Sequence, residues 1–318
     1  MDKRFMDGLA VAILVMLAGV TLASGPAATT AQETVPTPTS DFSEVSKLYN
    51  QGLAYLGQGN YQQAIQYFSN AIALDPNNAD AYAARGIAHF YLQEYEQAIS
   101  DYTRAIELKP ENGLAYHYRG IAYSTTGHYS QAIADFSRAL ELNPDYIDSY
   151  FNRGITYHRM EEYDYAIADF THVIEVNPGD CEAYLSRGLA YALKREYELA
   201  INDFDRAVAC GMENAKVFYN RGHAYYDLGE YPQAITDLTR AIELDPAHVN
   251  AYDLRGTAYV ILGQYAQAIA DYTHAIELAP QEARGYYHRA LIYWRTGSYR
   301  EALSDLIRCF EIRLAMRN

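Results

Sequence analysis

Residues 79–112 read ADAYAARGIAHFYLQEYEQAISDYTRAIELKPEN, and variants of this 34-residue unit follow one another without insertion from Val45 to Met316. When the first residue of each copy is position 1, position 8 is Gly in seven copies and position 20 is Ala in all eight. A fixed period of this length predicts a stacked array, because one unit alone cannot bury its apolar face. The copies span 45–78, 79–112, 113–146, 147–180, 181–214, 215–248, 249–282 and 283–316.

Each copy predicts two amphipathic α-helices, A and B, of about a dozen residues each. In the second copy, Tyr82, Gly86 and Phe90 recur at helical spacing, and Ala98 and Tyr102 do so in the second half. Gly near position 15 marks the turn between the helices, and Pro at position 32 ends helix B. We expect the Gly at position 8 to face the Ala at position 20, so that the two backbones lie close together. The predicted fold class is all-α.

The repeated pattern closely resembles the tetratricopeptide repeat (TPR) family. It has an aromatic residue at position 4, Gly at 8, Tyr at 11, Ala at 20, an aromatic at 24, Ala at 27 and Pro at 32 in most copies. Met212 and Leu314 replace the Pro in the fifth and eighth copies. The resemblance covers residues 45–316 and implies a right-handed superhelical solenoid of antiparallel helix pairs. It also implies a concave groove, lined by helices A, that holds an extended peptide or a partner helix.

The groove positions implied by the resemblance are 2, 5, 6, 9, 12 and 13 of each helix A. They carry mostly apolar and aromatic side chains, which commonly anchor partners, although packing between neighbouring helices A is the alternative role. Asn152 and Asn220 are candidates for hydrogen bonds to a bound backbone. The candidate partner-binding residues are Phe90, Tyr91, His117, Ile121, Phe151, Asn152, Ile155, His158, Leu185, Leu189, Tyr219, Asn220, His223, Tyr226, Tyr287, Leu291 and Trp294.

Positions 7 and 23 depart from the family in a regular way. Position 7 is Arg and position 23 is Asp in copies two to eight, whereas the first copy has Gln51 and Tyr67. The joint appearance predicts a ladder of Arg–Asp pairs, because guanidinium and carboxylate groups match in a half-buried seam. The ladder either braces helix A against helix B or forms a charged strip for a ligand. Its residues are Arg85, Arg119, Arg153, Arg187, Arg221, Arg255 and Arg289, with Asp101, Asp135, Asp169, Asp203, Asp237, Asp271 and Asp305.

The last predicted helix, 301–316, carries an apolar face that no following helix A covers. Leu306, Ile307, Phe310 and Leu314 lie on it, and Ile307 replaces the Ser, Thr or Asp of other copies. Terminal repeats normally need a polar outer face. This edge therefore either binds another protein or a second copy, giving a homo-oligomer through the C-terminal helix, or remains exposed and frayed.

Residues 1–25 predict a signal peptide or an N-terminal membrane anchor. Lys3 and Arg4 precede an uncharged apolar run, residues 9–23, and small residues follow it. This order is typical of a secretory signal, while the run is short for a bilayer span and would act as a tether if retained. Residues 26–44 are rich in Thr, Pro and Ala and predict a disordered spacer. Both interpretations place the repeats outside the cytoplasm, in the periplasm or secreted.

The three cysteines do not form a disulfide framework. Cys309 stands at a position that is Ala in most copies and predicts a small core residue. Cys181 and Cys210 open and close the fifth copy, and antiparallel helices would bring them near each other. Whether they form a disulfide is not decided by the sequence, because the Cα separation is strictly limited.

Composition and motif spacing exclude several classes of function. The net charge is −15, and nucleic-acid binding rests on many Lys and Arg, so we expect no nucleic-acid partner. The sequence contains no metal-binding His or Cys spacing, phosphate loop or nucleophile elbow, so we expect no metal, no cofactor and no enzyme activity. A protein or peptide partner is the main expectation. The alternative is a carbohydrate- or lipid-binding groove of an envelope or polysaccharide export apparatus.

Overall fold

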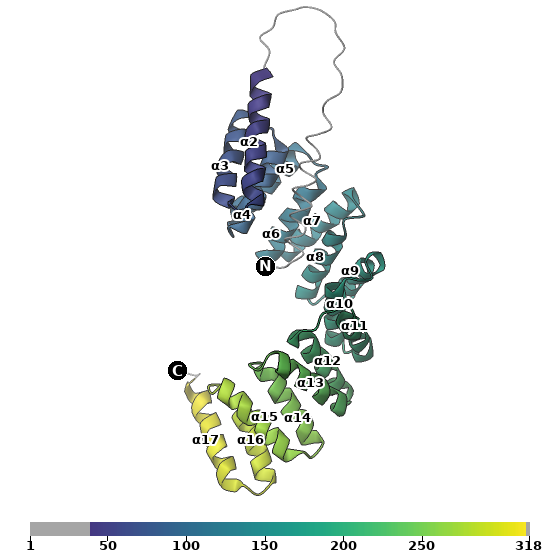
Figure 1. Cartoon of the computed structure of the whole chain (residues 1–318), viewed down its shortest axis with the longest axis vertical. Helices are drawn as coiled ribbons and strands as arrows, with labels where there is room; N and C mark the ends of the chain where they lie inside the picture. Colours follow the sequence, from purple (N-terminus) through teal and green to yellow (C-terminus); the bar gives the residue numbers. More distant parts are fainter. Residues whose placement is uncertain (1–38, 316–318) are drawn as a thin grey trace, which may run out of the picture. The chain divides into compact units, whose positions relative to one another are not determined.

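The computed structural model describes residues 39–315, and in this range the chain forms sixteen α-helices and no strand (Figure 1). Helices A are α2 (Thr39–Gly57), α4 (Ala79–Tyr91), α6 (Gly113–Thr125), α8 (Ile147–Arg159), α10 (Cys181–Leu193), α12 (Ala215–Leu228), α14 (Val249–Ile261) and α16 (Ala283–Arg295). Helices B are α3 (Tyr61–Leu74), α5 (Tyr95–Leu108), α7 (Tyr129–Leu142), α9 (Tyr163–Val176), α11 (Tyr197–Ala209), α13 (Tyr231–Leu244), α15 (Tyr265–Leu278) and α17 (Tyr299–Ala315). The predicted all-α solenoid of helix pairs is confirmed.

The N-terminal boundary of the array differs from the sequence prediction. Helix α2 begins at Thr39, so residues 39–44 are helical although they were assigned to the disordered spacer. The predicted leader, residues 1–25, lies outside the described residues, as does most of the spacer. At the other end, α17 runs to Ala315 through the position where other repeats carry Pro.

The chain divides into two compact units, residues 1–162 and 163–318, and the boundary falls inside the fourth repeat, between α8 and α9. Within the described part of each unit, every helix packs against its neighbour in sequence, as consecutive helix pairs require. In the first unit, helices A also touch the next helix A, from α2 to α8. In the second unit, α12 touches both α10 and α14.

The turns between helices A and B require an unusual backbone conformation at position 15. All eight residues there have positive φ, and five of them are Gly, which adopts this region without a steric penalty. The other three are Gln93, Glu161 and Arg195, with φ between 62° and 64°. The turn geometry is therefore imposed by the helix pair and is kept even where the sequence does not supply Gly.

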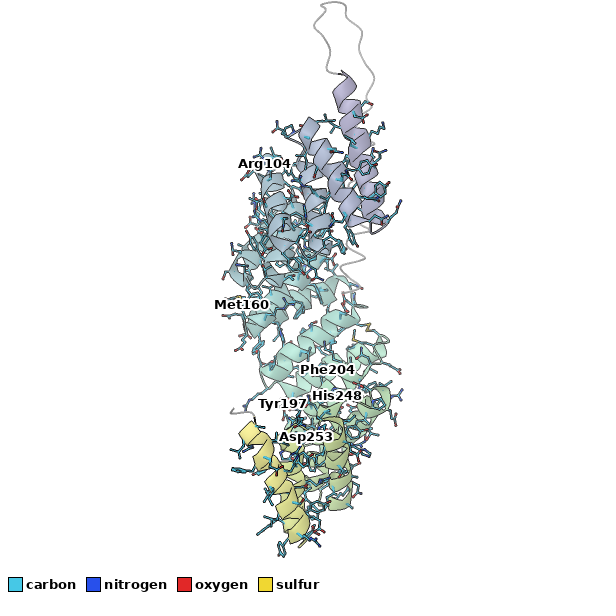
Figure 2. The ribbon with its side chains drawn as sticks, turned by 90° about the vertical axis from the view of Figure 1, so that its left-hand side faces the viewer. Arg104, Met160, Tyr197, Phe204, His248 and Asp253 are labelled. Carbon is cyan, nitrogen blue, oxygen red and sulfur yellow. A yellow bond between two sulfur atoms is a disulfide. The ribbon has the colours of Figure 1, made fainter. Side chains whose placement is uncertain are left out.

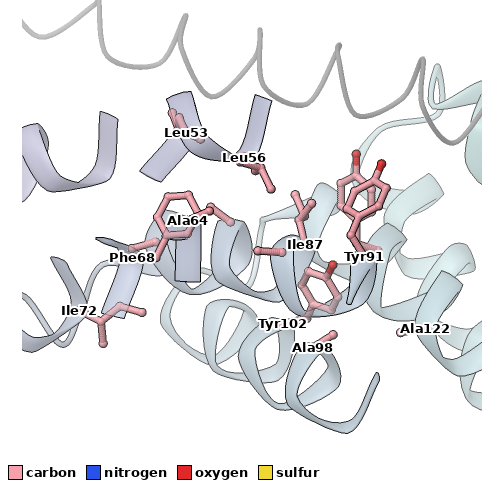
Figure 3. Packing of buried hydrophobic residues seen from close by; sticks show 14 of the residues in the cluster. Leu53, Leu56, Ala64, Phe68, Ile72, Ile87, Tyr91, Ala98, Tyr102 and Ala122 are labelled. Carbon is pink, nitrogen blue, oxygen red and sulfur yellow. The ribbon is translucent and has the colours of Figure 1, made fainter. Parts of the chain in front are cut away.

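The Gly at position 8 makes room for an aromatic ring in most repeats. A Cβ atom added at Gly86 would lie 2.8 Å from the ring of Tyr102, and one added at Gly120 would lie 2.9 Å from the ring of Phe136. Both rings are fully buried, as is the ring of Phe68, which faces Gly52. Figure 3 labels Phe68 and Tyr102 in this buried cluster. The expectation that this Gly faces the Ala at position 20 is therefore wrong in its main contact: the ring at position 24 occupies the space.

Two repeats carry Leu, not an aromatic residue, at position 24. The sixth repeat keeps Gly222 at position 8, and a Cβ atom added there would lie 3.1 Å from Cγ of Leu238. The last repeat has Ala290 at position 8 and Leu306 at position 24. Leucine at position 24 therefore occurs with either Gly or Ala at position 8.

Candidate functional site

Six of the predicted Arg–Asp pairs have both members in one unit, and all six are bidentate ion pairs. Arg119 Nε donates to Asp135 Oδ2 at 2.7 Å, and its Nη2 donates to Asp135 Oδ1 at 2.8 Å. The same arrangement recurs at 2.7–2.9 Å between Arg85 and Asp101, Arg187 and Asp203, Arg221 and Asp237, Arg255 and Asp271, and Arg289 and Asp305. The seventh pair, Arg153 and Asp169, has one member in each unit.

Each of these arginines also reaches back to the preceding repeat. Arg119 Nη1 donates to Thr103 Oγ1 at 3.0 Å, and Arg153 Nη1 donates to Ser137 Oγ at 3.0 Å. The acceptor is always position 25 of the preceding helix B, and it is Ser, Thr or Asp there. One guanidinium therefore joins three helices of two repeats, a role that the sequence analysis did not foresee although position 25 is visibly polar.

The environment of the guanidinium groups favours a structural role. The Arg119 side chain is 16% exposed and Asp135 is 8% exposed, and the guanidinium lies over the ring of Tyr116. Hydrogen bonding to Asp237 raises the pKa of Arg221 above its usual value, so this group stays charged. The first repeat lacks the pair, and Tyr67 stacks on Tyr55 with ring centroids 5.2 Å apart. The geometry favours a brace over a charged strip that is open to a ligand.

We use "A-helix face" for the seventeen partner-binding candidates on helices A. Five of them are buried: Tyr91, His117, Ile121, Phe151 and Leu185. Burial makes these five packing residues in the structure, because their side chains offer little surface to a ligand. Eight are partly buried: Phe90, Asn152, Ile155, His158, Leu189, Tyr219, Asn220 and Tyr226. Four are exposed: His223, Tyr287, Leu291 and Trp294.

The accessible part of the A-helix face is concentrated in the second unit. Tyr219 stacks on His223 within α12. The centroid of the Tyr219 ring lies 4.5 Å from that of His248, which is labelled in Figure 2. In α16, Tyr287, Leu291 and Trp294 are 41%, 51% and 61% exposed and follow one another at helical spacing. This face presents aromatic and apolar groups to solvent, whereas the equivalent positions of α4 and α6 are mostly closed.

The two asparagines proposed to bind a peptide backbone are bonded to their own helices. Asn152 Nδ2 donates to the carbonyl oxygen of Asp148 at 2.8 Å, and Asn220 Nδ2 donates to that of Lys216 at 2.7 Å. These contacts orient the amides along the helix. A bound backbone would therefore have to use the remaining amide hydrogen or the side-chain oxygen.

His117 is a buried neutral histidine rather than a ligand contact. Its Nδ1 lies 2.8 Å from Ser149 Oγ, and its ring packs edge-on against those of Phe136 and Tyr146. Burial lowers the pKa of His117 from 6.5 to about 3. Because the folded pKa lies below the unfolded one, this histidine supports folding fully above pH 6.5, and its contribution is lost as the pH falls towards 3.

We expect the His117→Gln variant to lose less stability on acidification than the wild-type protein. The imidazole should contribute a loss of about 1.4 kcal/mol per pH unit between its two pKa values. Glutamine stays neutral and can still bond to Ser149. The measurement is urea unfolding at pH 7, 6, 5 and 4 for both proteins. Parallel plots of unfolding free energy against pH would contradict this account of His117.

A cavity of about 490 Å³ opens between the repeats of the first unit. It lies where the N-terminal ends of α4 and α6 meet α2 and the end of α7. Its walls include Tyr49, Ala83, Tyr118 and Tyr146, and Asp80 stands at its side. The Tyr49 hydroxyl is buried without a hydrogen-bond partner in the described structure. This cavity was not predicted from the sequence, although Ala83 is the smallest of the eight residues at position 5.

The C-terminal edge is apolar and accessible. On α17, Leu303, Leu306, Ile307, Phe310 and Leu314 are 38–64% exposed. In interior repeats the residue equivalent to Phe310 is covered, as for Ile106 and Ile242, which are both 9% exposed. Cys309, next to Phe310 in the sequence, is buried as a free thiol, which agrees with its prediction as a small core residue.

The structure joins Cys181 and Cys210 in a disulfide, with their Cα atoms 5.8 Å apart. Cys181 is the first residue of α10 and Cys210 follows the last residue of α11. The antiparallel helices bring the two ends of the fifth repeat together, and Gly211, with φ at 102°, continues the chain where other repeats approach their Pro. The disulfide thus closes a repeat that lacks the usual proline.

Between residues 39 and 315, no helix is both long and apolar enough to cross a membrane. The predicted tether, residues 9–23, lies outside this range. The described residues also contain no cluster of three or more His, Cys, Asp or Glu side chains that could hold a metal ion.

Models of the tetratricopeptide repeat match the chain across most of the array. The matched segments are 49–113, 101–134, 125–161, 147–180, 215–248, 238–270, 256–297 and 283–315. The chain therefore belongs to the tetratricopeptide repeat family. Its fold is that of protein-interaction scaffolds, which are generally not enzymes. No curated protein sequence matches the chain.

Solved structures of TPR proteins are similar to this chain. YrrB, described as a TPR protein with an unusual peptide-binding site, is 26% identical with a TM-score of 0.53, over 58% of this chain and 95% of YrrB. MamA is 26% identical with a TM-score of 0.51, over 52% of this chain and 96% of MamA. The C-terminal part of a TPR protein from Cytophaga hutchinsonii is 18% identical with a TM-score of 0.65, over 76% and 98%, and shows the fold alone.

Proposed function

We propose that this protein is a non-enzymatic, extracytoplasmic scaffold that binds an extended peptide or a partner helix along its A-helix face. The observation that carries the proposal is the exposed row of Tyr287, Leu291 and Trp294 on α16. Aromatic side chains of this kind supply most of the binding energy at protein interfaces, and exposed apolar rows in soluble proteins usually mark such sites. The peptide-binding site described for YrrB supports a peptide as the ligand class.

The side chains of α12 make the A-helix face suitable for polar ligands as well. Tyr219, His223 and Tyr226 stand at the same three positions as the α16 row, and their polar ends can hydrogen-bond a backbone. Phenol and imidazole groups combine apolar area with donors and acceptors, which suits a peptide better than a lipid chain. A saccharide could stack on the same rings, and it remains the alternative ligand.

The binding proposal predicts a strong dependence on the accessible aromatic residues of the A-helix face. Peptides selected by display on the purified protein should bind Trp294→Ala and Tyr226→Ala at least about tenfold more weakly, a loss of about 1.4 kcal/mol or more. The matched control is Tyr165→Ala, which removes an exposed aromatic side chain from helix B α9. Fluorescence anisotropy measures each Kd.

Three results would overturn the proposal for peptides. The first is an equal loss of affinity in Tyr165→Ala, and the second is no loss in either A-helix variant. The third is selective binding of oligosaccharides, but not of peptides, on a glycan array. That result would favour the carbohydrate alternative in an envelope or export apparatus.

The extracytoplasmic location rests on residues 1–25. A basic start, the apolar run 9–23 and the small residues after it support export, with the run either removed or kept as a membrane tether. Cell fractionation followed by N-terminal sequencing of the protein tests both possibilities. Recovery of the full chain in the cytoplasm would contradict the proposed location.

We further propose that the C-terminal edge on α17 pairs with the same edge of a second copy. An ordinary helix A would bring an Arg that needs a polar acceptor at position 25, and Ile307 cannot accept a hydrogen bond. Two identical apolar faces, in contrast, complement each other about a twofold axis. The exposed side chains of Phe310 and Leu303 would then be buried.

This pairing predicts a dimer in light scattering coupled to size-exclusion chromatography. Phe310→Glu should elute as a monomer, because a charge would be buried at the centre of the contact. Leu199→Glu, which places the same charge on an exposed apolar position of α11, serves as the control and should remain dimeric. A monomeric wild-type protein at tens of micromolar would contradict the pairing.

A further inference from the structure

We infer that the cavity of the first unit is a subsite for a cationic side chain of the arginine type, carried by a bound peptide. It is walled by Tyr49, Ala83, Tyr118 and Tyr146 and flanked by the carboxylates of Asp80 and Glu111. Its volume of about 490 Å³ falls in the range of sites that hold small molecules or single side chains.

Ala83 is the reason that this space is open. Position 5 of helix A is filled by a larger side chain in every other repeat, as by His117 and Phe151 in the two repeats that follow. In those repeats the side chain is buried between neighbouring helices. In α4 a single methyl group stands there, between the tyrosines of α2 and α6. The next two repeats therefore fill this position, whereas the second repeat leaves a gap there.

Tyr49 supplies evidence that the gap is suited to a polar ligand. The residue is 7% exposed, and its hydroxyl oxygen has no hydrogen-bond partner in the part of the chain that the structure describes. Leaving such a group buried and unpaired carries a desolvation cost that no hydrogen bond offsets. A ligand that bonds to this hydroxyl would recover that cost, whereas an apolar ligand would not.

The charges around the cavity select the kind of polar group. Asp80 and Glu111 stand at its rim against one basic residue, Lys109. Asp80 and Tyr49 line the same cavity, and burial and the charge of Asp80 both raise the pKa of Tyr49. A group that donates hydrogen bonds to a carboxylate and to a neutral phenol oxygen, and that stacks on aromatic rings, is a guanidinium.

The rest of the molecule shows that this environment suits arginine. Arg85 is bonded to Asp101 and lies over the ring of Tyr82, with 5.4 Å between the guanidinium carbon and the ring centroid. Arg255 has the same two partners in Asp271 and Tyr252. The cavity offers tyrosine rings and a carboxylate without an internal arginine among its lining residues.

The test uses N-acetylarginine amide and its neutral isostere, N-acetylcitrulline amide, titrated into the full chain and followed by ligand-observed saturation-transfer NMR. We expect the arginine probe to bind at least five times more tightly than the citrulline probe. Ala83→Leu should abolish binding by filling the cavity, and Asp80→Asn should weaken it at least fivefold. Asp227→Asn, which neutralises an exposed carboxylate on α12 in the second unit, should have no effect.

Equal binding of the two probes would overturn the inference, as would binding that survives both Ala83→Leu and Asp80→Asn. Displacement of the arginine probe by cellobiose would also overturn it, in favour of a polyol site. If Ala83→Leu does not fold, Asp80→Asn and Tyr49→Phe still decide the question. Asp80 is exposed and Tyr49→Phe removes only the unpaired hydroxyl, so both should fold.

The identification of the ligand as a peptide side chain rests on the proposed function, but the cavity is tested without a peptide. Probe binding in a protein that captures no peptide would uphold the cation subsite and remove the peptide-scaffold proposal. Peptide binding that depends on Trp294, without probe binding, would uphold the peptide-scaffold proposal and remove the cation subsite.

Discussion

Gly120→Leu should unfold or strongly destabilise the first unit. A Cβ at Gly120 would lie 2.9 Å from the ring of Phe136, which is completely buried. Overpacking of this kind costs about 1–3 kcal/mol for added methylene groups and more when the backbone must move. We expect a loss of about 3 kcal/mol or more for Leu. The direction of the stability change is informative, because replacing a Gly inside a helix by Leu otherwise stabilises the helix by about 1 kcal/mol.

The matched control is Gly179→Leu. Gly179 lies in the loop between α9 and α10, is exposed, and has no atom closer than 3.5 Å to the added Cβ. Thermal unfolding followed by circular dichroism compares the two variants. If Gly120→Leu and Gly179→Leu melt together with the wild-type protein, close approach at position 8 does not hold the helix pair.

Arg119→Leu should destabilise the same unit by about 3–5 kcal/mol, because it leaves the Asp135 carboxylate buried without its cation. Thr103 also loses a donor from the next repeat. Urea unfolding at low and high salt measures the effect. The loss should persist at 1 M salt, since screening acts mainly on exposed charges.

A double variant separates charge pairing from simple loss of packing. Arg119→Leu together with Asp135→Leu replaces the ion pair by apolar side chains and should recover most of the stability lost in Arg119→Leu. Arg104→Ala breaks an exposed pair with Glu107 on the surface of α5 and should not measurably change unfolding. No recovery in the double variant would contradict the brace.

The Arg–Asp ladder shows how far sequence reasoning extends in a repeat protein. Arg119 and Asp135 could be paired from the sequence because they stand sixteen residues apart in every copy that has either one. The third contact, to Thr103, involves the preceding repeat and was not assigned. A contact within one copy is repeated in register, whereas a contact between copies depends on how the copies stack.

The A-helix face shows the limit of the same reasoning. The family resemblance implied that His117 and Trp294 both line the groove, yet His117 is buried and Trp294 is 61% exposed. Each exposed fraction depends on the volumes of residues in adjacent repeats. The family resemblance supplies positions but no side-chain volumes, so it cannot distinguish a packing residue from a binding residue.

By itself, the sequence determined the all-α repeat, the helix pairs, the turns and the Arg–Asp pairing, because each depends on residues within one 34-residue period. The tertiary structure decided which faces stay open, that the ring of Phe136 and not Ala132 opposes Gly120, and that Ala83 leaves a cavity beside Tyr49. These features depend on steric fit between repeats. Steric fit is a property of side-chain volumes in three dimensions, and no spacing along the chain encodes it.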